Sequence, residues 1–121
     1  MKAVCVVLFV LVAAAMASNK EERYNNLDIE ELVSNKCVFK SYLDCFRDSD
    51  FCNAITETYR PDYLEAMLTA CSGCNDKQKH VAHRFIDAAL EQFPAESELL
   101  ATMMDPTGIL MPRITAAVKS Y

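Results

Sequence analysis

The fold is decided by residues 45–74, which read CFRDSDFCNAITETYRPDYLEAMLTACSGC. Four cysteines lie here with the spacing C-x6-C-x18-C-x2-C: Cys45, Cys52, Cys71 and Cys74. Four cysteines allow three pairings, and the pairing of neighbours would close two small rings at helix ends. Each short ring would stabilise the fold by about 2 kcal/mol and would pin one corner of a helical bundle without joining distant parts.

Two other uses of these cysteines compete with structural disulfides. Zinc binding is disfavoured because C-x6-C is an unusual knuckle spacing. Cys71-Ser72-Gly73-Cys74 has the length of a redox motif, but the chain lacks the βαβ setting in which that motif normally occurs. Structural disulfides are the favoured interpretation. Cys37 is then an unpaired cysteine: either a small group tucked beside Val38, or a functional residue that forms an intermolecular disulfide or acts as a reactive thiol.

Residues 1–17, MKAVCVVLFVLVAAAMA, predict a secretory signal peptide that is cleaved after Ala17. The apolar run is shorter than the ~20 residues that a transmembrane helix needs. We therefore expect residues 18–121 to form a single helical domain that is secreted, with no membrane insertion after cleavage. Export to an oxidising compartment also favours disulfides over free thiols.

The charge of the chain argues against nucleic-acid binding. Removal of Lys2 takes the basic residues from 12 to 11 against 17 acidic ones, a net charge of −6. Phosphates would repel such a protein. His80 and His83 lie one helical turn apart and could form half of a metal site, but no third ligand is evident, so solvated polar residues are favoured. We find no nucleophile elbow, phosphate loop or paired carboxylates, and expect no enzyme, catalytic residue, metal or cofactor.

Apolar residues recur at helical spacing, and no stretch alternates for long enough to predict a strand. Asp28 with Glu31 and Asn75 with Gln78 are capping-box pairs that mark two helix starts. Pro61 is expected to divide its helix into two pieces, with a single kinked helix as the alternative. Residues 18–26 are expected to be polar and mobile. The predicted fold class is all-α, a compact bundle of about six short helices.

The clearest helical pattern is an apolar face formed by Ala82, Phe85, Ile86, Ala89, Leu90 and Phe93. A helix from Ala95 to Met104 is expected to turn Leu99, Leu100 and Met103 inward, and a last helix should follow Pro112. The interior candidates of the whole chain are Val38, Tyr42, Leu43, Leu64, Met67, Phe85, Ile86, Ala89, Leu100 and Met103. Such side chains describe an ordinary core as well as a ligand pocket.

The cysteine spacing and the residues around it resemble the insect chemosensory protein family, also called the olfactory-segment-D type. C-x6-C-x18-C-x2-C is the signature of that family. Residues 24–28, YNNLD, are similar to its Tyr-Asp-Asn-Ile-Asp opening, and Tyr42 lies three residues before the first cysteine, as in the family. Lys77-Gln78-Lys79, Pro94 and the turn 105–108, DPTG, also fall in register. The resemblance covers about Tyr24 to Gly108.

This resemblance implies six helices around an apolar cavity, with disulfides Cys45–Cys52 and Cys71–Cys74. It also implies a secreted carrier that reversibly binds small hydrophobic ligands such as odorants, pheromone-like compounds or fatty-acid-like chains. Tyr24 and Tyr42 match aromatic positions that face the ligand in such proteins. With the interior candidates they give the predicted ligand-binding residues: Tyr24, Tyr42, Leu43, Leu64, Met67, Phe85, Ile86 and Leu100. The alternative is a secreted interaction protein with a filled cavity, a monomer or a Cys37-linked dimer.

The chain departs from the family pattern at four places. Ser97 stands where a Trp is typical, and Cys37 replaces a basic residue. The family's Pro-Asp-x-Leu appears three residues early, at 61–64, and Ile109-Leu110-Met111 follows the turn where Lys-Tyr is typical. These changes indicate a divergent member with a more apolar end and with its own ligand preference.

Overall fold

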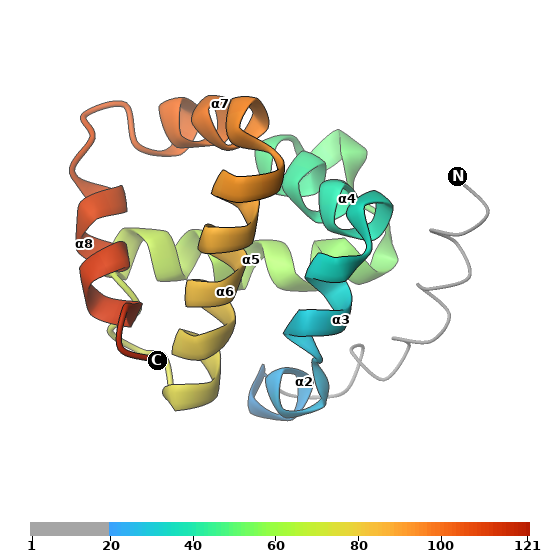
Figure 1. Cartoon of the computed structure of the whole chain (residues 1–121), viewed down its shortest axis with the longest axis horizontal. Coiled ribbons are helices and arrows are strands. Elements are labelled where there is room, and N and C mark those ends of the chain that lie inside the picture. The colour runs from blue at the N-terminus through green and yellow to red at the C-terminus, as the bar shows by residue number, and fades with distance from the viewer. Residues whose placement is uncertain (1–19) are drawn as a thin grey trace. The chain divides into compact units, whose positions relative to one another are not determined.

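The computed structural model describes residues 20–121, and the elements in this range are all helices (Figure 1). In chain order they are α2 (Lys20–Asn26), α3 (Ile29–Ser34), α4 (Lys36–Arg47), the short 3-10 helix η2 (Ser49–Phe51), α5 (Ala54–Thr69), α6 (Asp76–Gln92), α7 (Pro94–Met104) and α8 (Leu110–Val118). No strand forms in this part of the chain. The prediction of an all-α fold is confirmed.

The chain divides into two compact units, one up to Arg60 and the other Pro61–Tyr121. The division falls inside α5, which runs through it as one helix. Each unit is described by itself below. The predicted signal peptide, residues 1–17, lies outside the described residues. No helix between residues 20 and 121 combines the length and the apolar character needed to cross a membrane.

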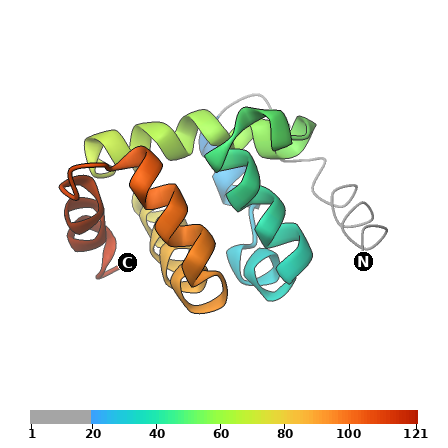
Figure 2. The same cartoon turned by 90° about the horizontal axis from the view of Figure 1, so that it is seen from above.

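The first unit is built on α3 and α4, which pack against each other (Figure 2). Asp28 caps α3 as predicted, because its side chain accepts the backbone N–H of Glu31 at 3.2 Å. Asn35 ends α3 and caps α4, accepting the backbone N–H of Val38 at 3.1 Å. One face of α4 is buried, formed by Val38, Phe39, Tyr42, Leu43, Cys45 and Phe46. This spacing at i, i+1, i+4, i+5, i+7 and i+8 is that of an amphipathic helix.

The end of α4 is tied to the start of α5 by two contacts. The Cys45–Cys52 disulfide closes the loop that contains η2, with the Cα atoms 4.4 Å apart. The Arg60 Nε–H of α5 donates to the carbonyl oxygen of Cys45 at 3.0 Å. The predicted pairing of these two cysteines is confirmed, and together the contacts fix how α4 and the first part of α5 face each other.

Helix α5 begins with a reciprocal cap, which was not among the predicted helix starts. The Asn53 side-chain oxygen accepts the backbone N–H groups of Ile55 and Thr56 at 2.8 and 2.9 Å. The hydroxyl of Thr56, which is fully buried, accepts the backbone N–H of Asn53 at 2.9 Å. Two backbone donors at the start of the helix and one just before it are thereby satisfied.

Helix α5 continues through Pro61, so the expectation of two separate helical pieces is wrong and its single-helix alternative holds. Proline removes one backbone hydrogen bond and crowds the preceding turn, at a cost of about 3 kcal/mol or more. The helix is buried on both sides of this point, since Tyr59 is 3% exposed and Met67 is 2% exposed. We attribute the continuity to this packing, which offsets the lost hydrogen bond.

Helix α5 ends in a Schellman-type turn that leads into the second disulfide. Ala70 and Cys71 both adopt the left-handed conformation, with φ of 52° and 61°. The Cys71 backbone N–H donates to the Ala66 carbonyl at 2.9 Å, the six-to-one bond of this motif. Cys71 is 1% exposed and pairs with Cys74, as predicted, with the Cα atoms 5.0 Å apart.

The core of the second unit lies between α5, α6 and α8. We define the α8 cluster as the buried residues Met67, Cys71, Ile114 and Val118. Partly buried apolar residues pack against it: Tyr63, Ala66, Cys74, Ala82, Ile86, Leu110, Met111 and Ala117. Helix α8 lies alongside α6 (Figure 1), and α6 begins with the predicted capping box of Asn75 and Gln78.

Several predictions of local detail are wrong. Residues 20–26 are helical, although we expected a mobile segment, because Tyr24 packs edge-on against Tyr59. Leu90, Leu99 and Met103 were expected inside but are 55%, 45% and 54% exposed. Small Ala88 turns inward on α6, and only Leu100 is buried on α7, whose apolar residues surround the helix and so do not define one face. The last helix begins at Leu110, before Pro112.

Candidate functional site

The first unit contains an aromatic cluster formed by Tyr24, Tyr42, Phe46 and Tyr59. Tyr59 lies at its centre, with ring centroids 5.6 Å from Tyr24 and 5.9 Å from Tyr42. Tyr42 in turn meets Phe46 at 6.2 Å in an edge-to-face arrangement. Such aromatic pairs contribute about 0.5–1.5 kcal/mol each beyond the area that they bury.

Three helices supply the aromatic cluster. Tyr42 and Phe46 are one turn apart on α4, so their rings lie on the same buried face. Tyr59 comes from α5, whose orientation against α4 is fixed by the neighbouring Arg60 and its bond to Cys45. Tyr24 comes from α2. The guanidinium of Arg23, also on α2, lies 5.9 Å from the Tyr59 ring centroid, within the range of a cation–π contact.

Burial disfavours the ionised form of two tyrosines of this fold, Tyr42 and Tyr63. Desolvation, and then the proximity of Tyr59, raise the pKa of Tyr42 far above its ordinary value. In the second unit, burial alone raises the pKa of Tyr63 in the same direction. The hydroxyl oxygens of Tyr42 and Tyr59 are also shielded from solvent. The aromatic cluster is therefore apolar and carries three phenol hydroxyl groups, two of which are shielded from solvent.

Three of the predicted ligand-binding residues lie in the first unit. Tyr42 and Leu43 are buried on α4, and Tyr24 is half-buried on α2. Tyr24 and Tyr42 are brought together through Tyr59, which was absent from the predicted set. Tyr59 lies four residues before Tyr63, a helical spacing that was visible in the sequence. Because a break was expected at Pro61, Tyr59 was placed at the end of a helix and was not included in the set.

The other five predicted residues lie in the second unit. Met67 belongs to the α8 cluster, Ile86 packs against it, and Phe85 meets Tyr63 with ring centroids 6.5 Å apart. Leu64 is half-buried on α5, and Leu100 is buried on α7 at 6% exposure. The roles of all eight residues in ligand binding remain predictions.

The second unit also carries an open surface groove of about 490 Å³ beside the turn between α7 and α8. Its lining consists of Glu98, Ala101, Thr102, Asp105, Pro106, Thr107, Gly108, Met111 and Pro112. The Asp105 carboxylate holds the turn by accepting the backbone N–H groups of Ile109 and Met111, each at 2.9 Å. None of the eight predicted ligand-binding residues belongs to this lining.

The two histidines make separate contacts. The His83 Nε2 atom lies 3.1 Å from an Asp87 carboxylate oxygen, and the His80 Nδ1 atom lies 3.1 Å from the Tyr121 carbonyl. Within residues 20–121 no group of three or more His, Cys, Asp or Glu side chains could hold a metal ion.

The expectation that Cys37 is an unpaired cysteine is wrong. Cys37 is half-buried on α4 and is disulfide-bonded, and none of the described cysteines is a free thiol. Cysteines pair according to their proximity in the fold. The prediction counted the cysteines within residues 18–121 only, which are odd in number, and so left Cys37 without a partner.

Within residues 20–121 both units are built of short helices with buried apolar residues, and two short-loop disulfides close their corners. The sequence model described as the insect pheromone-binding family, A10/OS-D, matches residues 21–111, and the chain belongs to this family. The resemblance drawn from the cysteine spacing is thus confirmed.

Individual relatives agree with this assignment. Ejaculatory bulb-specific protein 3 of Drosophila melanogaster is 26% identical over 110 residues, covering 91% of this chain and 87% of that protein. Allergen Tha p 1 of Thaumetopoea pityocampa is 25% identical over 99 residues, covering 82% and 79%. A solved structure, described as a chemosensory protein in complex with bromo-dodecanol, matches with a TM-score of 0.66 and 21% identity, covering 78% of this chain and 95% of that one.

Proposed function

We propose that this chain is a secreted carrier that reversibly binds small hydrophobic molecules, such as odorants, pheromone-like compounds or fatty-acid-like chains. The observation that carries the proposal is the family match over residues 21–111, a family described as pheromone-binding. The structural relative with bromo-dodecanol supports a ligand that combines an alkyl chain with one polar group. The apolar run of residues 1–17 supports secretion.

The aromatic cluster offers chemistry that suits such a ligand. We propose that the rings of Tyr42 and Tyr59, which contact each other, also contact the alkyl chain, and that a phenol hydroxyl exchanges a hydrogen bond with an oxygen of the ligand. In the second unit, Met67 and Ile86 supply apolar surface without a polar group. We propose that the eight predicted residues contribute ligand contacts, with Tyr42 as the first to test because it is 3% exposed and contacts both Tyr59 and Phe46.

Apolar contacts set the expected affinity. Burial of each methylene contributes about 0.8 kcal/mol before the entropic cost of association is subtracted. An alkyl chain can therefore reach micromolar affinity, roughly −8 kcal/mol. Specificity between neighbouring chain lengths is expected to be loose, since about 0.8 kcal/mol per methylene corresponds to only about a fourfold change in the dissociation constant.

The test is displacement of an environment-sensitive fluorescent probe by a homologous series of n-alkanols. We expect the dissociation constant to fall by up to about fourfold for each added methylene until the chain fills the site. Tyr42→Ala should weaken binding, whereas the matched control Phe51→Ala should not, because Phe51 is an exposed aromatic of the same unit at 59% exposure. Circular dichroism must show that both variants are folded. Equal affinity for all chain lengths, or an equal loss in both variants, would contradict the proposal.

The alternative is a secreted interaction protein of the same fold that binds no small molecule. It predicts no dependence of probe displacement on chain length. The same titration therefore separates the two functions.

A further inference from the structure

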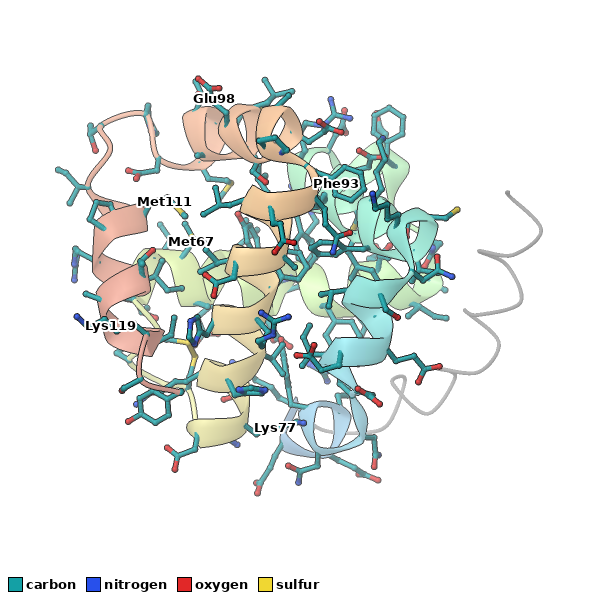
Figure 3. All side chains as sticks on the ribbon, viewed as in Figure 1. Met67, Lys77, Phe93, Glu98, Met111 and Lys119 are labelled. Carbon is teal, nitrogen blue, oxygen red and sulfur yellow. A yellow bond between two sulfur atoms is a disulfide. The ribbon has the colours of Figure 1, made fainter. Side chains whose placement is uncertain are left out.

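The four methionines of residues 20–121 lie in different environments. Met67 is 2% exposed, Met103 is 54% exposed, and Met104 and Met111 are half-buried. Of these four, Met111 alone both lines the open groove and packs against the α8 cluster (Figure 3). Its side chain thus borders solvent on one side and a buried core on the other.

The backbone at Met111 is held in place. Its N–H donates to Asp105 at 2.9 Å, and the neighbouring Ile109 N–H donates to the other oxygen of the same carboxylate. Asp105 is itself 5% exposed. Because the backbone is fixed, a chemical change at the Met111 sulfur must be accommodated by its side chain and by the residues packed against it.

We propose that Met111 is an oxidation-sensitive site, at which a small peroxide entering the groove forms methionine sulfoxide and loosens α8 from its cluster. The sulfur lone pair attacks one oxygen of hydrogen peroxide, the O–O bond breaks and an S–O bond forms. The other oxygen leaves as water with both hydrogens. Sulfur loses two electrons, and the peroxide is reduced by two electrons.

The sulfoxide cannot keep the place of the thioether. Its oxygen needs a hydrogen-bond donor, but the side chains of the α8 cluster are those of Met, Cys, Ile and Val. The groove is open to solvent and is lined by the hydroxyl of Thr107, whereas the Thr102 hydroxyl already donates to the Glu98 carbonyl at 2.9 Å. The oxidised side chain therefore turns toward the groove and leaves Ile114 and Val118 less well packed.

The experiment exposes the folded, disulfide-bonded chain to hydrogen peroxide. Peptide mapping by mass spectrometry follows the gain of one oxygen at each methionine, and urea titration of the same samples gives the unfolding midpoint. Met103 should react first without moving the midpoint, because its side chain is largely solvent-exposed. Met111 should react next, at least about tenfold faster than sealed Met67, and the midpoint should fall as it does. Treatment with methionine sulfoxide reductases should restore it.

Two variants separate the contributions. Met111→Leu nearly conserves volume, and its midpoint should resist peroxide. Met103→Leu is the matched control, and after peroxide treatment its unfolding midpoint should fall as much as that of the wild type. Oxidation of Met111 no faster than that of Met67 would overturn the proposal, as would an equal fall in the Met111→Leu midpoint. These readouts involve no ligand, so they stand apart from the proposed carrier function.

Discussion

Replacement of Ala70 by glycine should stabilise this protein, although replacement of alanine by glycine inside a helix is usually destabilising. Ala70 occupies the position after the last residue of α5 with φ of 52°, where glycine is the usual residue. The bond from the Cys71 N–H to the Ala66 carbonyl at 2.9 Å fixes this turn and does not depend on the side chain at position 70. Glycine can therefore take the place of alanine without loss of a hydrogen bond.

Two terms give the magnitude. The left-handed conformation costs a residue with a Cβ roughly 1–2 kcal/mol, which glycine avoids. Glycine in turn loses more backbone entropy on folding, roughly 0.4–1 kcal/mol. The net expectation for Ala70→Gly is a stabilisation of about 0.5–1 kcal/mol.

The assay is equilibrium urea unfolding under non-reducing conditions, with the disulfides intact. The midpoint of Ala70→Gly should rise with an unchanged slope. The matched control is Ala116→Gly on α8, an exposed helical alanine that lacks a positive φ. It should lose about 0.5–1 kcal/mol. If both variants are destabilised to the same extent, the left-handed assignment of Ala70 is refuted.

Three further variants test a helix start, the α8 cluster and a buried carboxylate. Asn53→Ala removes the acceptor of two backbone N–H groups and should cost about 1 kcal/mol by urea unfolding, and an unchanged midpoint would argue against the cap. Ile114→Ala truncates a side chain that is 2% exposed and should lower the free energy of unfolding by about 2–5 kcal/mol. A smaller loss would mean that α8 is loosely packed. Backbone hydrogen bonds, led by that of Met111, lower the pKa of Asp105 against the opposing effect of burial. An ionised carboxylate whose pKa is lowered by folding stabilises the folded state above about pH 4. This stabilisation is lost as the pH falls through the pKa of the folded state. Asp105→Asn should therefore be destabilising at pH 7 and progressively less so as the pH falls below about 4, whereas an effect that does not change with pH would contradict this role.

The class of fold and the paired cysteines could be read from the sequence because both depend on short-range patterns. Helical periodicity and the caps at Asp28 and Asn75 act within a few residues. Cys45–Cys52 and Cys71–Cys74 close rings so short that family spacing alone indicated them.

What the sequence did not reveal depends on contacts between distant residues. Helix α2 forms where Tyr24 meets Tyr59, a contact that its polar neighbours do not signal. Helix α7 is apolar all round, so its pattern could not tell that Leu100 is buried and Met103 exposed. Pro61 suggested a break because local propensity cannot weigh the tertiary packing on either side of it.

The candidate site was predicted as a set of apolar residues, and the structure distributes them between two units. Tyr24 and Tyr42 share Tyr59 as a neighbour, and Met67 and Ile86 meet at the α8 cluster. Leu, Ile and Met are chosen alike for cores and for pockets, which is why composition could not say which of them contact a ligand.

The most direct test of the carrier function is native mass spectrometry of the secreted protein with fatty acids and alcohols of about twelve to eighteen carbons. The account predicts reversible one-to-one adducts on a folded monomer, weakened in Tyr42→Ala and retained in Phe51→Ala. A protein that shows no adduct with any of these chains, while remaining folded, would contradict it.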